Sequence, residues 1–144
     1  MSNTLSMKVS SYIKATDIII NNIDKALGKA EALQFKRELE ELKHSYEYQK
    51  SILSKEFLKE DKEINEEDEV WRSIINALES QETVVLKNDA CILKYINTTY
   101  ELSIKMQDEL LKEFNYEDNN FYLDVTKALE ATNKAIKPLK NYRK

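Results

Sequence analysis

Residues 28–57 read GKAEALQFKRELEELKHSYEYQKSILSKEF, and this stretch decides the fold that the sequence predicts. Long or apolar side chains recur in it at spacings of three and four, which is the pattern of one buried helix face. These side chains are Phe35, Leu39, Leu42, Tyr46, Gln49 and Leu53, with Phe57 one turn further on. Gly28 is the single glycine of the chain, and glycine is typical of a helix end. We therefore expect one helix to end near Gly28 and a long helix to occupy residues 30–60.

The residues before Gly28 predict a partner for that helix. Residues 5–27 carry a second apolar face with the same alternating spacing, formed by Val9, Ile13, Thr16, Ile20, Ile23 and Leu27. Because the connection around Gly28 is short, the two helices should form an antiparallel hairpin.

The second half of the chain predicts another hairpin. Residues 59–69, KEDKEINEEDE, read as a polar linker, and a short apolar-faced helix with Trp71 follows. Ser80 is a plausible N-cap for a helix over residues 80–114. The last helix should bury one face and end near Pro138; that face is Phe121, Val125, Ala128, Thr132, Ala135 and Leu139.

These elements together predict an all-α protein in which residues 1–144 form a single domain. Two antiparallel hairpins are joined by a long crossover that contains a short extra helix, as in ferritin-like four-helix bundles. One glycine and one proline in 144 residues leave long helices with few forced stops.

Composition excludes several classes of function. A formal net charge of −4 argues against nucleic acid as a partner, since phosphate neutralisation requires a basic surface. The longest apolar runs, such as Ile18 to Ile20, are far shorter than a membrane span. The single cysteine, Cys91, cannot form an internal disulfide, and no charged leader with an apolar stretch opens the sequence. We therefore expect a cytoplasmic protein with no membrane or nucleic-acid partner.

A ferritin-like layout raises the question of a two-metal carboxylate site. Such a site needs inward carboxylates and Glu-x-x-His pairs on facing helices. Glu41 and His44 have that spacing, and Glu130 begins an incomplete second copy. Helical geometry, at about 100° per residue, turns all three away from the apolar faces, and Asp24 only flanks one. Asp24, Glu41, His44 and Glu130 remain the candidate ligands, but we expect no complete metal site and no cofactor.

Other catalytic constellations are absent from the sequence. Cys91 falls on the expected inner face of the helix over residues 80–114, where a small buried apolar residue is favoured over a nucleophile. One glycine cannot build a phosphate-binding loop. The buried phenols Tyr46 and Tyr95 need hydrogen-bond partners. The candidate partners are Thr16, Gln49, Asn88 and Thr99. A polar network inside the bundle is the first interpretation, and a small-ligand pocket is the alternative.

The helix over residues 80–114 carries two apolar stripes. The first is assigned to the core: Val84, Cys91, Tyr95, Thr99, Leu102 and Met106. The second lies about 180° away from the first at helical spacing: Leu86, Leu93, Tyr100, Ile104 and Leu111. Since a helix of a four-helix bundle needs one such face, the second stripe should be covered by the short helix around Trp71 or by another subunit. We therefore predict that this stripe forms an interface, with a homodimer or another protein partner.

The order of elements, with three short stretches, resembles a bacterial group of ferritin-like bundles of unknown function. The stretches are Ile23 to Leu27, residues 66–78 around Val70-Trp71-Arg72, and Tyr100-Glu101-Leu102. The resemblance implies the bundle fold and brings no biochemical activity with it. Acidic residues that are typical of the group fall near Leu93 and Lys94 here, and Asp24 is the one carboxylate of the first helix that is placed similarly.

Two functional interpretations follow from the sequence. The first is a non-enzymatic helical bundle that acts by association, with itself or with another protein. The second is a divergent ferritin-like metal-binding protein linked to iron handling or oxidative stress.

Overall fold

The structure is a computed structural model that describes residues 3–57, 69–81, 84, 86–112 and 119–140. Within these ranges the chain forms five α-helices and no strand, which confirms the all-α class. The helices are α1 (Asn3–Lys29), α2 (Leu33–Phe57), α3 (Glu69–Gln81), α4 (Asp89–Leu111) and α5 (Asn119–Lys140). The expected linker over 59–69 and the expected loop over 115–120 lie almost wholly outside the described residues.

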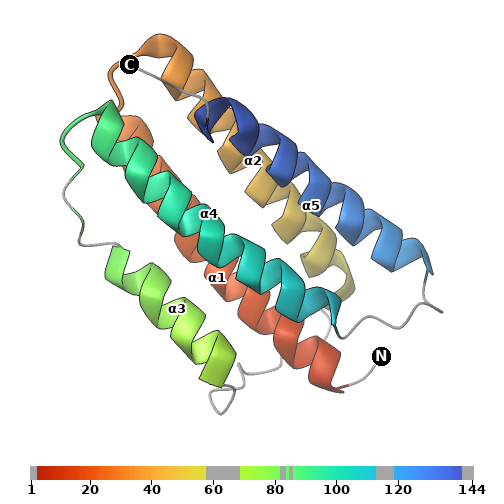
Figure 1. The fold of residues 1–144 in the computed structure, drawn as a ribbon. Helices are drawn as coiled ribbons and strands as arrows, with labels where there is room; N and C mark the ends of the chain where they lie inside the picture. Colours follow the sequence, from red (N-terminus) through yellow and green to blue (C-terminus); the bar gives the residue numbers. More distant parts are fainter. Residues whose placement is uncertain (1–2, 58–68, 82–83, 85, 113–118, 141–144) are drawn as a thin grey trace.

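Four long helices lie side by side and α3 lies on the outside (Figure 1). Helices α1 and α5 run in one direction, whereas α2 and α4 run in the other (Figure 1). Both α2 and α4 pack against α1 and α5, so each long helix has two antiparallel neighbours. Helices α2 and α4 therefore face each other diagonally across the bundle, and α3 packs onto α1 and α4.

The buried face of α2 is the one that the sequence predicts. Phe35, Leu39, Leu42, Tyr46, Gln49 and Leu53 are all buried, each no more than 2% exposed. On α5 the predicted face is also buried, although Ala135 is only half-buried and Leu129 and Ile136 join the core. Pro138 lies inside the last turn of α5, as expected.

The predicted face of α1 is only one edge of the face that is buried. Val9, Thr16 and Ile23 are buried, while Ile13, Ile20 and Leu27 are only partly buried. The hydrophobic core also takes five side chains outside the predicted set: Tyr12, Ala15, Ile18, Ile19 and Ala26. The reason is that α1 packs against α2, α3 and α4, so its neighbours cover more than one seam.

The start that the sequence predicts for α4 is wrong. Ser80 does not cap α4: it lies in the last turn of α3, where its hydroxyl donates to the Ala77 carbonyl at 2.7 Å. The N-cap of α4 is Asn88, whose side chain accepts from the Cys91 amide at 2.9 Å. The end of α1 at Lys29 agrees with the helix end predicted near Gly28, although no described residue, Gly28 included, has a positive φ.

Asp89 ties the second hairpin to the start of α2. Its carboxylate is fully buried and accepts hydrogen bonds from the amides of Glu31 at 2.7 Å and Ala32 at 3.0 Å. Both amides belong to the two residues just before α2. Ala32 is the N-cap of α2, since its carbonyl accepts from the Lys36 amide at 3.0 Å, so Asp89 holds the chain at the entry to α2 from the first turn of α4. The sequence signal for this contact was an acidic residue beside the N-cap Asn88, but its partners are distant in the chain.

Candidate functional site

The centre of the bundle is polar. The Tyr12 phenol donates to Gln49 Oε1, and Gln49 Nε2 donates to Thr132 Oγ1 at 2.5 Å. The Thr132 hydroxyl donates in turn to Ser45 Oγ at 2.9 Å, and Ser45 donates to the Leu42 carbonyl at 2.6 Å. All these side chains are buried and come from α1, α2 and α5. A polar network therefore lies inside the bundle, as the sequence predicted, but its phenol is Tyr12, where the prediction named Tyr46 and Tyr95.

The expected partners of the phenols are corrected in three places. Gln49 accepts from Tyr12, but Thr16 donates to the Tyr12 carbonyl at 2.8 Å. Asn88 caps α4, and the Thr99 hydroxyl makes no hydrogen bond among the described residues. Burial raises the pKa of Tyr12 and of Tyr46, so both phenols stay neutral.

Polar groups without partners concentrate on α4. Thr99, Ser103 and Gln107 are spaced by four residues, which places them on one side of the helix. They are at most 5% exposed, and Thr99 Oγ1, Ser103 Oγ and Gln107 Nε2 make no hydrogen bond among the described residues. Tyr46 Oη on α2 also makes no hydrogen bond within 3.5 Å, although the Ser103 hydroxyl lies close enough to oppose, as a hydrogen-bond partner, part of the rise that burial causes in the pKa of Tyr46. The sequence shows this spacing, but the predicted core stripe was centred elsewhere and included only Thr99.

The candidate metal ligands lie outside the bundle and apart. Asp24 is exposed and pairs with Lys43 at 2.6 Å, while Glu41 and Glu130 are exposed. The imidazole of His44 is 74% exposed and its Nδ1 lies 3.2 Å from Glu47, so the outward orientation predicted for His44 is confirmed. No group of three His, Cys, Asp or Glu residues able to hold a metal occurs in the described part of the chain.

The two stripes predicted on α4 are the two edges of one broad buried face. Ile92, Ile96, Ser103 and Leu110 lie between them and are buried. In the predicted core stripe, Val84 is 43% exposed and Cys91 is only half-buried, which corrects their assignment to the core. The face is broad because α4 packs against three neighbours, α1, α3 and α5.

The second stripe is covered largely by its own chain. Tyr100 is buried and donates to Asn133 Oδ1 of α5 at 2.6 Å. The other four members are half-buried and pack against the core: Leu86, Leu93, Ile104 and Leu111. Helix α5 covers Tyr100. The sequence predicted that the helix around Trp71 or another subunit would cover this stripe.

A groove remains between α4 and α5 on the outside of the bundle. It has a volume of about 670 Å³ and is lined by Asn97, Tyr100, Glu101, Ile104, Lys105 and Lys140. The Lys140 ammonium lies 4.9 Å from the centre of the Tyr100 ring, which is the geometry of a cation–π contact. Asn97 Oδ1 is shielded from solvent and makes no hydrogen bond among the described residues. Two members of the predicted interface, Tyr100 and Ile104, therefore line this groove.

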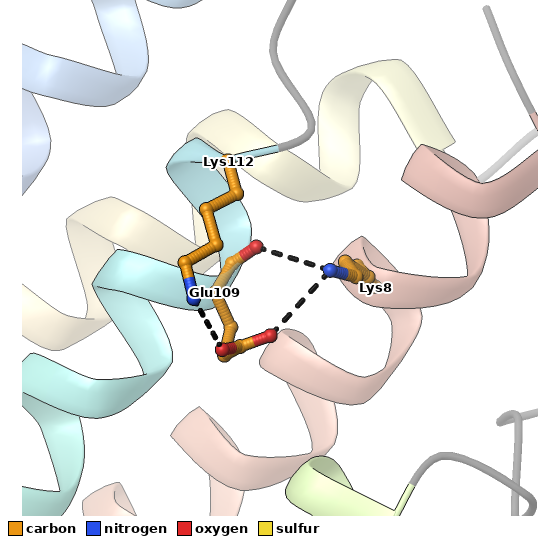
Figure 2. Close-up of polar contacts among 3 residues, drawn as sticks. All are labelled: Lys8, Glu109 and Lys112. Carbon is orange, nitrogen blue, oxygen red and sulfur yellow. Dashed lines mark hydrogen bonds and ion pairs between the residues drawn. The ribbon is translucent and has the colours of Figure 1, made fainter.

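An ionic cluster joins α1 to the end of α4. Glu109 lies between two lysines, with its carboxylate 3.0 Å from Lys112 Nζ and 3.5 Å from Lys8 Nζ (Figure 2). Lys8 also lies 3.5 Å from the Glu109 carbonyl, near the negative end of the α4 dipole (Figure 2). The hydrogen bond from Lys112, with the charges of both lysines, lowers the pKa of Glu109. The cluster links the start of α1 to the last turn of α4.

Comparison of the chain with protein-family models, curated protein sequences and solved structures finds no significant match. The site must therefore be interpreted from its own geometry. None of the helices in the described ranges is long and apolar enough to cross a membrane.

Proposed function

We propose that this protein is a non-enzymatic helical bundle that acts by self-association through the α4–α5 groove. The observation that carries the proposal is the groove itself, an outward hollow whose lining includes the half-buried apolar side chain of Ile104. A second copy of the same chain would lay its own α4 along the groove, related by a two-fold axis.

The charges on α4 favour a second copy as the occupant. Glu101 and Lys105 are exposed, line the groove, and lie one turn apart. A two-fold axis crossing α4 between them brings Glu101 of each copy opposite Lys105 of the other. Two identical ion pairs then form across the axis. An alignment in which the two α4 helices are shifted lengthwise would oppose like charges and is therefore disfavoured.

Charge reversal tests this arrangement. Glu101→Lys and Lys105→Glu should each reduce dimerisation, because each variant opposes like charges twice. An equimolar mixture of the two variants should restore a dimer, since both opposed pairs are then of unlike charge. Sedimentation equilibrium at tens of micromolar measures the mass. Glu41→Lys, an exposed change on α2 with the same effect on net charge, is the matched control and should leave the wild-type dimer intact.

A wild-type protein that stays monomeric throughout this range would disprove self-association. If the wild type is a dimer and both charge-reversal variants dimerise as strongly as the wild type, the proposed α4–α5 interface and its two-fold register are disproved.

We also propose that the fold is ferritin-like, as the resemblance to the bacterial group implies, and that the protein is cytoplasmic. The helix directions support the first point, because α2 and α4 run the same way and are joined by a connection that contains α3. The unpaired Cys91 agrees with a reducing compartment. The placement of Asp24, Glu41, His44 and Glu130 gives no support to the metal-binding interpretation, and metal analysis of the purified protein tests it.

A further inference from the structure

The α4–α5 groove contains a lysine from α5 as well as the charges of α4. Lys140 lies in the last turn of α5, and its ammonium is 4.9 Å from the centre of the Tyr100 ring. The cation–π contact holds the ammonium in the groove but leaves its N–H groups able to donate. Lys140 forms no ion pair within the described part of the chain. The groove therefore presents a positioned positive charge that no described carboxylate of the same chain pairs with.

Asp108 continues the row of α4 side chains that faces the groove. Asn97, Glu101 and Ile104 line the groove, and successive spacings of four, three and four residues place Asp108 on the same side of the helix. Asp108 is exposed, and it forms no ion pair with another described residue. Its carboxylate is therefore available to a second copy that lies along this side of α4.

The two-fold axis of the proposed dimer brings these two charges to the same level. The axis crosses α4 level with Ser103, so Asp108 of the second copy lies opposite Thr98, about 7.5 Å along the helix from the axis. Thr98 is uncharged, so α4 alone offers Asp108 no opposite charge. Tyr100, which holds the Lys140 ammonium, lies within about 3 Å of the same level. Lys140 can therefore supply the positive charge that position 98 lacks.

We propose that Lys140 is a specificity-determining residue of the dimer, through an ion pair with Asp108 of the second copy. The proposal rests on self-association through the groove, and it makes α5 part of an interface whose charges otherwise come from α4. The two-fold axis repeats the pair, so each copy contributes one Lys140 and one Asp108. With the two pairs of Glu101 and Lys105, four ion pairs then fix the lengthwise alignment of the two copies.

One pair of like charges lies further from the axis. Lys94 is opposite Lys112 of the second copy, about 13.5 Å along the helix from the axis. Helices that cross at an angle have begun to separate at this distance, and the Lys112 ammonium is already 3.0 Å from Glu109 of its own chain. Repulsion between these lysines is therefore weak, and the charges near the axis decide the alignment.

Charge reversal of the whole chain tests the pair. Lys140→Glu and Asp108→Lys each oppose like charges at two places, and each should raise the dissociation constant of the dimer by about tenfold. An equimolar mixture of the two variants should recover the wild-type constant, because both pairs are then of unlike charge. Sedimentation equilibrium measures the constants. Lys134→Glu, an exposed change on another side of α5, and Glu41→Lys on α2 are the charge-matched controls and should leave the constant unchanged.

The outcomes separate this pair from the self-association on which it rests. A monomeric wild type, or a dimer that neither Glu101→Lys nor Lys105→Glu weakens, would remove both proposals. If those two variants weaken the dimer but Lys140→Glu and Asp108→Lys weaken it no more than the controls do, the pair alone is overturned. Weakening by both variants without recovery in the mixture would also overturn the pair, because the two residues would then act separately.

A milder set of variants decides the question if a charge reversal prevents folding, which circular dichroism detects. Lys140→Gln and Asp108→Asn remove the charges without adding repulsion. Each should weaken the dimer less than the reversal does, and the double variant should weaken it by less than the product of the two single effects. Single effects that multiply fully in the double variant would show that the two residues are not paired.

Discussion

At the scale of single residues, helix α2 offers a sharp contrast between His44 and Tyr46. His44 is mostly exposed, so His44→Ala should change the free energy of unfolding by less than about 0.5 kcal/mol. Tyr46 is 1% exposed, and Tyr46→Ala should cost about 3 kcal/mol because it leaves a cavity in the core. Urea denaturation followed by circular dichroism measures both. Equal effects would mean that α2 is rotated relative to its position in the structure.

Among the polar residues at the helix starts, Asp89 should lower the free energy of unfolding most when it is replaced. Asp89→Ala leaves the amides of Glu31 and Ala32 without an acceptor, and should cost about 2–3 kcal/mol. Asp89→Asn retains one acceptor oxygen and should cost less. Asn88→Ala, which removes the neighbouring cap of α4 itself, should cost about 1 kcal/mol. Should Asp89→Ala prove no worse than Asn88→Ala, the link between α4 and the start of α2 would be discarded.

At the scale of the helices, the sequence predicted α2 well and α1 and α4 only in part. The difference lies in the number of neighbours. α2 packs against two helices, so a single seam describes its buried face. α1 and α4 each have three neighbours because α3 packs onto both. The spacing of apolar residues therefore predicts only one edge of the buried face of α1, without Tyr12 and Ile19. For α4 it predicts both edges of the buried face but not its centre at Ile96.

For the candidate site, the sequence predicted the presence of a polar network but not which helices contribute the hydrogen-bond partners. Phenols on the buried faces indicated a polar network, and Gln49 does accept from a phenol, although that phenol is Tyr12 and not Tyr46 or Tyr95. The partners contributed by other helices, such as Thr132 and Asn133, depend on how the helices are aligned lengthwise. A sequence without aligned relatives carries no information on that alignment. The groove beside α5 was missed for the same reason.

The contact between α1 and α4 should depend on pH through Glu109. The lysines lower the folded-state pKa of Glu109 below its ordinary value near 4.5, so its ionised form stabilises the folded protein. This contribution is present above pH 4.5 and is lost as the pH falls through the lower folded-state pKa. Glu109→Gln should therefore destabilise the protein at pH 7 by no more than about 1 kcal/mol, and the difference should vanish in acid.

Chemical denaturation of both proteins at a series of pH values measures this difference. Glu130→Gln, an exposed change on α5, is the control and should show no comparable loss on acidification. If Glu109→Gln lowers the free energy of unfolding by the same amount at low pH as at pH 7, the effect comes from packing and not from charge.

At the scale of the whole molecule, the structure predicts an order of opening. α2 lies between α1 and α5 and packs most extensively against both, whereas α3 lies on the outside against α1 and α4 (Figure 1). Elements with fewer buried contacts open at lower free energy than the core. α3 is nevertheless anchored, because Trp71, Ile74 and Leu78 are buried and the Trp71 ring meets Tyr12 edge-on at 6.1 Å.

Native-state hydrogen exchange should therefore show the amides of α3 opening before those of α2 and α5. Ile74→Ala should lower the opening free energy of α3 by about 2 kcal/mol or more, since it empties space between α3 and the bundle. The amides of α2 should respond less, because they exchange only when the whole bundle unfolds. Arg72→Ala, an exposed change on α3, is the control and should alter neither. If Ile74→Ala weakens α2 and α3 by the same amount, α3 belongs to the cooperative core and the bundle unfolds as a unit of five helices within the described ranges.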